Sequence, residues 1–474
     1  MKNVYTLISF FLLCTLQMVA QTNINWSTPI TVADGNQFGS MRPRIAFADG
    51  QPVILWGKSS TRDVFVSRFD GSLFSTPVNV SDQNLDAFVF NWTGPEITGS
   101  GNDVFVTYTT EPAEEGKVVL VKSVDGGLTF SDTVNVDPPD SDLPRFSSVK
   151  IDENGNPLVL YMQFDSTFGN PVNVLSRSMN GGISFMNPVE ASSVINGDPC
   201  DCCNGYLIVD ENYVLNLFRN NENNIRDSWC AISTNDGASF NESVRVDTNN
   251  WMMMTCPSST PVGLVKGDQL ISAFMNAADG MTRLYISKTD LTNQNFIFHR
   301  MFKMSSQNQN HPRIAGDDDV TGIVWSESSE VMFTYSMDDD SLGMITDTLN
   351  SMIAGFTQNP DIIYAEGKFH VTWENMTSGE VYYSVGDLGL PSGTEEFFQS
   401  EENYTISKTA KGYFINSQNA ASIELFSING QSGGSQFIQA GENFLFNTQF
   451  FSSGIYLLRI QTDSNCFTEK LLVE

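Results

Sequence analysis

The sequence predicts an all-β protein, a seven-bladed β-propeller followed by a small C-terminal β-sandwich. Two observations carry this prediction. One pattern of short strands recurs seven times between Trp26 and about Leu388, at intervals of 48 to 57 residues. Apolar and polar residues alternate along these strands, and no stretch shows the period of an amphipathic helix. Four short antiparallel strands repeated at this spacing are typical of propeller blades.

Each unit opens with a short strand, followed by a turn and by a second strand that ends in an aromatic residue. The opening position and the aromatic are thirteen residues apart, as in Pro43 and Trp56. The same step links Pro95 to Tyr108, Ser148 to Tyr161, Gly205 to Phe218, Pro261 to Phe274, Pro312 to Trp325 and Pro360 to Trp373. Seven such pairs predict seven units.

A third strand in each unit ends in serine, and in three units this serine begins the motif S-x-[DN]-x-G-x-[ST]-F. The spacing predicts a tight hairpin turn. We expect the Asp or Asn to bond local backbone, the glycine to adopt a conformation closed to other residues, and the phenylalanine to anchor the turn in the core. The motif residues are Ser123, Asp125, Gly127 and Phe130; Ser178, Asn180, Gly182 and Phe185; and Ser233, Asn235, Gly237 and Phe240.

The seventh unit lacks a fourth strand of its own. The segment Trp26–Val32 (WSTPITV) nearly duplicates Phe74–Val80 (FSTPVNV), which is the fourth strand of the first unit. We therefore expect the N-terminal segment to supply the outer strand of the last blade and to close the ring. Closure also removes a sheet edge that would favour aggregation.

Composition limits both compartment and partners. The chain has 474 residues and a net charge of −30, and such a base-poor chain offers no basic stripe for nucleic acid. The apolar stretch from Val4 to Ala20 predicts a signal peptide over residues 1–20. No later stretch is apolar enough to span a bilayer. We expect an exported monomer in a compartment where disulfides persist.

The repeats end near residue 388, and a different unit follows. Residues 389–402 (GLPSGTEEFFQSEE) are expected to form a linker. Residues 403–474 are predicted to form the small β-sandwich. Its expected strands are Ser422–Ile428, Phe444–Asn447, Gly454–Ile460 and Phe467–Val473.

Two resemblances to known families rest on these motifs. The S-x-D-x-G-x-T-F turns resemble the Asp boxes, or BNR repeats, of the sialidase superfamily, over roughly residues 24–390. The segment Ile423–Gln431 (IELFSINGQ), followed by SGIYLLRI and the terminal EKLLVE, resembles a type IX secretion C-terminal sorting domain. The second resemblance implies handling by the type IX secretion machinery, followed by release or attachment at the outer cell surface.

The sialidase resemblance implies a specific kind of active site. That family uses six blades, which is the alternative to the seven counted here. It also uses an arginine triad for the substrate carboxylate, a tyrosine nucleophile activated by glutamate, and an aspartate acid/base. Arg44 and Arg313, each following the proline that opens a blade, are the candidates for the axis, with Arg219 or Arg226 as the third. The alternative interpretation is that these arginines are solvated rim residues.

Strand alternation indicates where a site lies. The turns after each first strand and the Asp boxes should share one face, and the remaining loops should share the other, around the mouth of the central channel. Arg44, Arg313 and His311 belong to this second face, which we call the ligand face. Acidic Glu96 and Asp361 occupy the position that corresponds to Arg44. Of the three histidines, only His311 is placed to be a general base.

The cysteines do not follow the repeat. Cys200, Cys202 and Cys203 precede the first strand of the fourth unit, and Cys256 precedes that of the fifth at the same offset as Cys200. These four thiols should therefore lie on the ligand face in neighbouring blades. The first interpretation is a disulfide framework that joins blades four and five. The second is a soft-metal thiolate site for Cu(I) or Zn.

Acidic clusters offer one further metal hypothesis. Asp317–Asp319 and Asp338–Asp340 could hold Ca²⁺, although solvated turns are the more usual role of such runs. Function is expected to be recognition of a glycan or protein ligand at the channel mouth. The alternatives are an exo-acting, sialidase-like glycoside hydrolase and a soft-metal-binding propeller. The sequence names no catalytic residue and no certain cofactor.

Overall fold

The computed structural model describes residues 24–388, apart from 36–39, 83, 140–141 and 255–256, and residues 404–473, apart from 410–411, 428–431, 441–442, 448–453 and 463–465. The chain divides into two units, Met1–Leu390 and Pro391–Glu474. The predicted signal peptide, residues 1–20, and the predicted linker, residues 389–402, lie outside the described residues.

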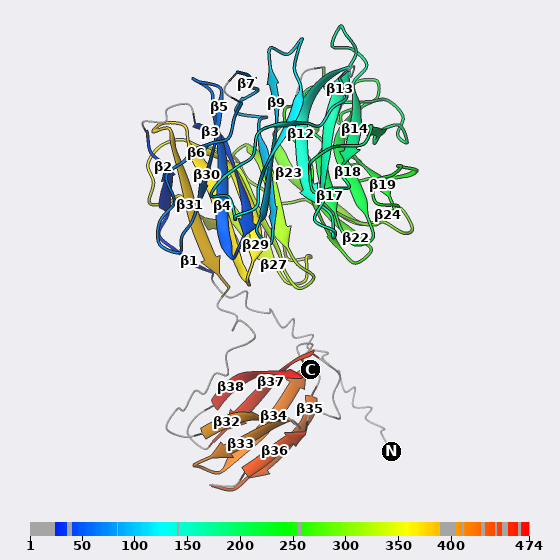
Figure 1. Cartoon of the computed structure of the whole chain (residues 1–474). Helices are drawn as coiled ribbons and strands as arrows, with labels where there is room; N and C mark the ends of the chain where they lie inside the picture. The colour runs from blue at the N-terminus through cyan, green and yellow to red at the C-terminus, as the bar shows by residue number, and fades with distance from the viewer. Residues whose placement is uncertain are drawn as a thin grey trace, which may run out of the picture. The chain divides into compact units, whose positions relative to one another are not determined.

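The described part of the first unit contains strands and no α-helix, arranged in seven antiparallel sheets (Figure 1). The first sheet is β3 (Ser40–Ala48), β4 (Gln51–Lys58), β5 (Asp63–Arg68) and β6 (Val78–Asn79). The second is β8 (Glu96–Ser100), β9 (Asp103–Glu111), β10 (Val118–Ser123) and β11 (Val134–Asn135), with β7 (Asp86–Ala87) beside β9. The third is β12 (Leu143–Ile151), β13 (Pro157–Phe164), β14 (Val172–Arg177) and β15 (Val189–Glu190).

The remaining four sheets follow the same order of strands. The fourth is β17 (Tyr206–Val209), β18 (Val214–Asn221), β19 (Ser228–Ser233) and β20 (Glu242–Arg245), with β16 (Asp198–Pro199) beside β18. The fifth is β21 (Val262–Lys266), β22 (Gln269–Asn276), β23 (Arg283–Asp290) and β24 (Asn295–Met301). The sixth is β25 (Gln309–Gly316), β26 (Thr321–Glu327), β27 (Glu330–Ser336) and β28 (Asp347–Thr348). The seventh is β29 (Thr357–Ala365), β30 (Lys368–Asn375) and β31 (Glu380–Asp387), with β1 (Asn25–Trp26) and β2 (Ile30–Ala33).

The first long strand of each sheet faces the centre of a ring. These inner strands pack against one another in sequence, from β3 through β8, β12, β17, β21 and β25 to β29, and β29 packs back against β3. A closed circle of twisted antiparallel sheets is a β-propeller, so the predicted fold class is confirmed.

The N-terminal segment closes the ring as predicted. Strand β2 pairs antiparallel with β31, with Ile30 opposite Tyr383, and β1 pairs with the far end of the same strand. Val32 and Ala33 are buried against Trp56 and Tyr383. The two ends of the propeller are therefore held together by one sheet.

The core of the propeller is a series of layers between neighbouring sheets. The seven repeat aromatics all lie on the second strand of their sheets and are at most 1% exposed. One layer joins Val53 and Leu55 of the first sheet to Val104 and Val106 of the second. Each sheet is thus covered by its neighbour, because a strand with two apolar faces needs a partner on each side.

The three predicted turns have the expected local bonds. Asp125 accepts hydrogen bonds from Ser123 Oγ at 2.7 Å and from Thr129 N at 2.9 Å, and Gly127 N donates to Ser123 Oγ at 2.9 Å. Gly127 has a φ of 91°, which side chains rarely allow. The turns at Ser178 and Ser233 repeat these bonds with Asn180 and Asn235. A fourth, less regular turn pairs Ser336 with Asp338, although its sequence does not match the motif.

The second unit contains two sheets with a shared core. One is β32 (Tyr404–Thr409), β33 (Gly412–Ser417) and β36 (Asn443–Asn447). The other is β35 (Ser432–Ile438), β34 (Ala421–Ser427), β37 (Gly454–Gln461) and β38 (Cys466–Val473). Ile415 of the first sheet and Leu425 and Leu458 of the second belong to one buried cluster, so the unit is a β-sandwich. The sequence predicted four of its seven described strands and missed β32, β33 and β35.

Candidate functional site

The inner strands carry bulges at the position that opens each blade. The register shifts between Met41 and Arg44 in β3, between Asn310 and Arg313 in β25, and between Gln358 and Asp361 in β29. A proline lies in each of these bulges, where its missing N–H costs no ladder bond. Bulges re-aim side chains and are common beside binding sites.

The residue before each of these prolines has a positive φ. The values are 52° for Arg42, 52° for His311 and 51° for Asn359. Few residues other than glycine adopt this region, and such strain collects at functional sites. The three strained residues come from neighbouring sheets, because β25 packs against β29 and β29 against β3.

Three arginines converge on one carboxylate beside these bulges. Glu96 of β8 forms ion pairs with Arg42, with Arg44 at 3.3 Å and with Arg313 at 3.4 Å. Arg313 also pairs with Asp361 at 3.5 Å. The arginine side chains are only 4 to 11% exposed, so the interpretation of Arg44 and Arg313 as solvated rim residues is wrong.

The cluster holds more positive than negative charge. Burial opposes ionisation of Glu96, but Arg42, Arg44 and Arg313 outweigh it and lower the pKa of that carboxyl to about 2. Burial and the two neighbouring guanidiniums lower the pKa of Arg44 to about 9, which leaves it protonated at neutral pH. Three guanidiniums thus face two carboxylates, Glu96 and Asp361. These ion pairs leave one positive charge, which an anion or the nearby carboxyl of Glu374 can balance.

A small hollow, partly open to solvent, lies over this cluster. Its walls include the three arginines and the side chains of His311, Trp92 and Asn359. Burial, followed by the charges of the arginines, lowers the pKa of His311 to about 3. His311 is therefore neutral at physiological pH. Its low pKa makes it a poor general base, the role that the sequence suggested for it.

Sequence reasoning missed Arg42, Trp92 and Glu374. Arg42 lies one residue before Pro43, but only the bulge shows that this position points toward the same carboxylate as Arg44. Trp92 precedes the first strand of its sheet in a loop without a repeat signal. Glu374 directly follows the repeat aromatic Trp373, where nothing in the pattern suggested a buried acid.

Glu374 is a buried carboxyl next to the hollow. It is 1% exposed and accepts hydrogen bonds from Asn359 Nδ2 at 2.7 Å, Gln358 Nε2 at 3.1 Å and the Arg42 backbone N–H at 3.1 Å. Burial raises its pKa to about 7, despite the hydrogen bonds that favour the ionised form. The carboxyl therefore titrates near neutral pH, as a group suited to proton transfer does.

The raised pKa of Glu374 predicts a pH-dependent stability. Between its ordinary value of 4.5 and about 7, the folded chain holds a proton that the unfolded chain has lost, so this carboxyl's contribution to stability falls as pH rises. We expect the free energy of unfolding, measured with urea, to depend less on pH between pH 5 and 8 in Glu374→Gln than in wild type. Glu366→Gln, at an exposed position, should leave the wild-type slope. An unchanged slope in Glu374→Gln would contradict the assignment.

Arg219 and Arg226 do not line the hollow. Arg219 is fully buried and donates to the carbonyls of Arg226 at 2.6 Å and Met275 at 2.7 Å, and its guanidinium lies over the Trp251 ring. Arg219 Nε and Arg226 Nη1 have no hydrogen-bond partner among the described residues. The structure thus separates these two arginines from the Arg42–Arg44–Arg313 cluster.

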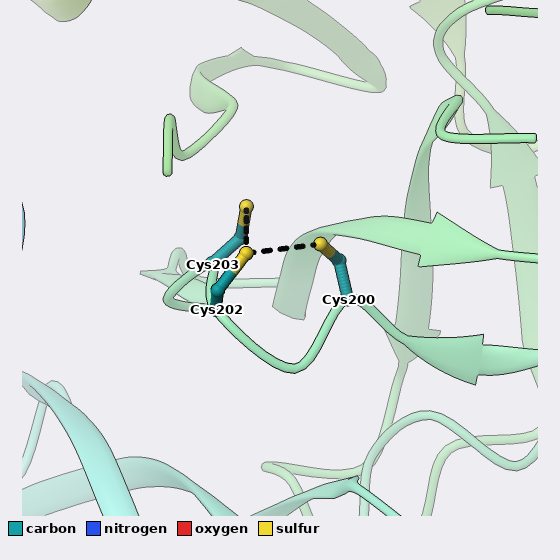
Figure 2. Close-up of side chains that lie close together, drawn as sticks. All are labelled: Cys200, Cys202 and Cys203. Atoms are coloured by element: carbon teal, nitrogen blue, oxygen red, sulfur yellow. Dashed lines mark hydrogen bonds between the residues drawn. The ribbon is translucent and has the colours of Figure 1, made fainter. Parts of the chain in front are cut away.

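Three cysteines meet beside Arg219 (Figure 2). The sulfur of Cys202 lies 3.5 Å from that of Cys200 and 4.0 Å from that of Cys203. These separations are too long for a disulfide among the three. Cys200 and Cys203 are free thiols, whereas Cys202 is disulfide-bonded. Cys256 lies outside the described residues, so its predicted link between blades four and five stays a prediction.

The thiol cluster fits a cation poorly. The three sulfurs lie within 4.8 Å of one another, which a soft metal could bridge. However, Cys202 is committed to its disulfide, and the charges of Arg219 and Arg226 act on the other two thiols. Burial opposes ionisation of Cys203, but the hydrogen bond from Cys200 and the charge of Arg219 lower its pKa to about 7. The environment stabilises a thiolate rather than a metal cation.

The two acidic clusters are engaged within the protein. Asp317 accepts hydrogen bonds from the backbone N–H groups of Asp319 and Val320, both at 3.0 Å. Asp339 forms ion pairs with Lys266 and Lys288, both at 3.1 Å. Two lysines on one carboxylate disfavour Ca²⁺ at Asp338–Asp340.

Comparison with family models identifies the C-terminal unit. Residues 400–474 match the secretion system C-terminal sorting domain. The chain is therefore exported through type IX secretion and is either secreted or held at the outer cell surface. No helix of the described residues is long and apolar enough to cross a membrane. The chain matches no curated protein.

Solved structures share the fold at low sequence identity. An ulvan lyase of polysaccharide lyase family PL25, bound to -[GlcA(1-4)Rha3S]-, is 10% identical with a TM-score of 0.50, over 76% of this chain and 96% of that one. A Dyadobacter fermentans protein of unknown function is 9% identical with a TM-score of 0.46, over 77% and 99%. Trypanosoma rangeli sialidase in complex with DANA is 10% identical with a TM-score of 0.43, over 94% and 87%. The likeness to the lyase shows the fold alone.

Proposed function

We propose that this exported sialidase-like propeller recognises a carboxylate-bearing glycan at the hollow over Arg42, Arg44 and Arg313. The observation that carries the proposal is the excess of one guanidinium over the carboxylates of the cluster. A ligand carboxylate would complete the charge balance and accept charge-assisted hydrogen bonds.

Two further features support a saccharide. Trp92 lines the same hollow as the arginines, and an aromatic face next to polar groups suits an amphipathic sugar ring. The ulvan lyase with the shared fold is bound to a saccharide that contains GlcA. The chemical class of that ligand matches the charge of the cluster, although the two chains share only 10% of their residues.

The test is a binding titration of the mature chain, measured by calorimetry. The probes are glucuronate and N-acetylneuraminate, and glucose is the uncharged control. We expect both acids to bind and glucose not to. Replacing Arg313 by Gln should weaken acid binding by about 10- to 100-fold, because a charge-assisted hydrogen bond is worth about 1.5–3 kcal/mol.

The matched control is Arg177→Gln. Arg177 bonds the Asp236 carbonyl near an Asp box, away from the hollow, and its loss should leave affinity unchanged. Equal binding of glucose and glucuronate would overturn the proposal, as would full affinity in both Arg44→Gln and Arg313→Gln with folding verified by thermal melting.

A glycoside hydrolase is the second candidate, favoured by Glu374. A carboxyl with a pKa near 7 that bonds a residue of the hollow could donate a proton to a leaving group. A panel of fluorogenic sialosides and other glycosides tests this function. Cleavage by the wild-type chain that is lost in Glu374→Gln would show that the protein is an enzyme. Binding of a glycan without any cleavage would support the recognition function instead.

A further inference from the structure

A second reactive centre lies outside the arginine cluster, at the turn from Cys200 to Cys203. The sequence Cys200-Asp201-Cys202-Cys203 places Cys200 and Cys203 at C-x-x-C spacing. The Cys203 N–H donates to the Cys200 carbonyl at 3.0 Å, which closes a tight turn. Both sulfurs belong to the group within 4.8 Å, and both thiols are free. The backbone thus holds two thiols close enough to form one bond after a small movement.

A buried guanidinium beside this turn has no carboxylate partner among the residues that the structure describes. Arg219 is 0% exposed and bonds only backbone carbonyls, and its Nε has no partner among the described residues. A buried charge without a counter-charge is strongly destabilising. A Cys203 thiolate supplies the missing negative charge, and the Cys200 thiol donates a hydrogen bond to it. One thiol is thereby prepared as a nucleophile and the other as a proton donor.

We propose that Cys200 and Cys203 form a redox-active dithiol that reacts with a hydroperoxide. Their side chains are at most 2% exposed, so only a small oxidant reaches them without unfolding of the turn. Hydrogen peroxide is the smallest member of that class. The two steps below require no other reactant.

In the first step the Cys203 thiolate attacks one peroxide oxygen, the O–O bond breaks, and hydroxide leaves, giving a sulfenic acid at Cys203. In the second step the Cys200 sulfur attacks the Cys203 sulfur and gives its proton to the hydroxide. The S–S bond forms as the sulfenic oxygen departs as hydroxide, which takes up the proton that Cys203 lost on ionisation and becomes the second water. Two thiols are oxidised and one peroxide is reduced to two waters. Arg219 stabilises the thiolate before the first step.

The test uses the purified full chain and one equivalent of hydrogen peroxide, with acid quenching, alkylation under denaturing conditions and peptide mapping. We expect Cys200 and Cys203 to become resistant to alkylation together, and peptide fragmentation to place the new disulfide between them. Finding the same disulfide in the isolated protein before peroxide is added would equally support the proposal. Oxidation should be about tenfold or more faster than at Cys230, a buried free thiol with no charged partner in the described part of the chain.

Three variants sharpen the result. Cys200→Ser should stop at a sulfenic acid on Cys203 that dimedone traps, Cys203→Ser should abolish the reaction, and Cys230→Ser should behave as wild type. The proposal is overturned if both thiols of the wild-type chain stay alkylatable after peroxide, or if Cys203→Ser reacts as fast as wild type. Mapping of the wild-type chain decides the question even if a variant fails to fold.

Discussion

Replacing Glu96 by Gln is expected to destabilise the propeller by about 3–5 kcal/mol, the cost of removing one partner from a buried ion pair. Glu96 is 14% exposed and is the shared counter-ion of Arg42, Arg44 and Arg313. Without its charge, three guanidiniums would face only Asp361. The measurement is chemical denaturation at pH 7 and low ionic strength.

Two controls separate charge from packing in this variant. Sulfate should recover more stability in Glu96→Gln than in wild type, since an added anion replaces the lost carboxylate. Glu115→Gln, at an exposed loop position, should lose less than about 0.5 kcal/mol. A variant that is as stable as wild type would show that Glu96 does not hold the arginines.

The lowered pKa of Glu96 also predicts how the stability of the propeller falls at acid pH. Its folded pKa of about 2 lies below the ordinary value of 4.5, so its contribution is present above pH 4.5 and is lost as pH falls toward 2. This part of the acid dependence should be missing in Glu96→Gln.

Val32→Asp is expected to open the ring. Val32 is 7% exposed in the layer formed with Trp56 and Tyr383, and a carboxylate there would be buried without a partner. We expect a loss of more than about 3 kcal/mol. Because β31 would then present a free edge, the variant should also aggregate on heating.

Thr31→Asp is the matched control on the same strand. Thr31 is exposed, since neighbouring residues of a strand point to opposite faces. It should keep the wild-type melting temperature within about 1–2 °C. Equal melting of Val32→Asp and wild type would contradict the role of β2 in closing the ring.

Prediction from sequence worked where a signal repeats. The aromatics from Trp56 to Trp373 each lie on the second strand of a sheet, and Ser123, Asp125 and Gly127 form the expected turn. Local physics explains this success, because strand alternation and turn chemistry are fixed by residues close in the chain. The sorting domain was identified in the same way, from contiguous motifs.

Prediction of the site worked only in part. Arg44, Arg313 and His311 line one hollow as their shared place in the repeat suggested, whereas Arg219 and Arg226 lie apart from it. Glu374 gave no signal, since its raised pKa arises from burial and not from its neighbours in sequence.

The sequence by itself determined the repeated blade, the closing N-terminal strand, the export signal at the C-terminus and the abundance of acid. Tertiary structure alone decided which arginines meet. Arg42, Glu96 and Arg313 are up to 271 residues apart in the chain, and closure of the ring places them in contact. Charge balance depends on these distances, because Coulomb energies fall with separation and rise with burial. A chain with so few bases thus holds three of them around one carboxylate, an arrangement that composition cannot reveal.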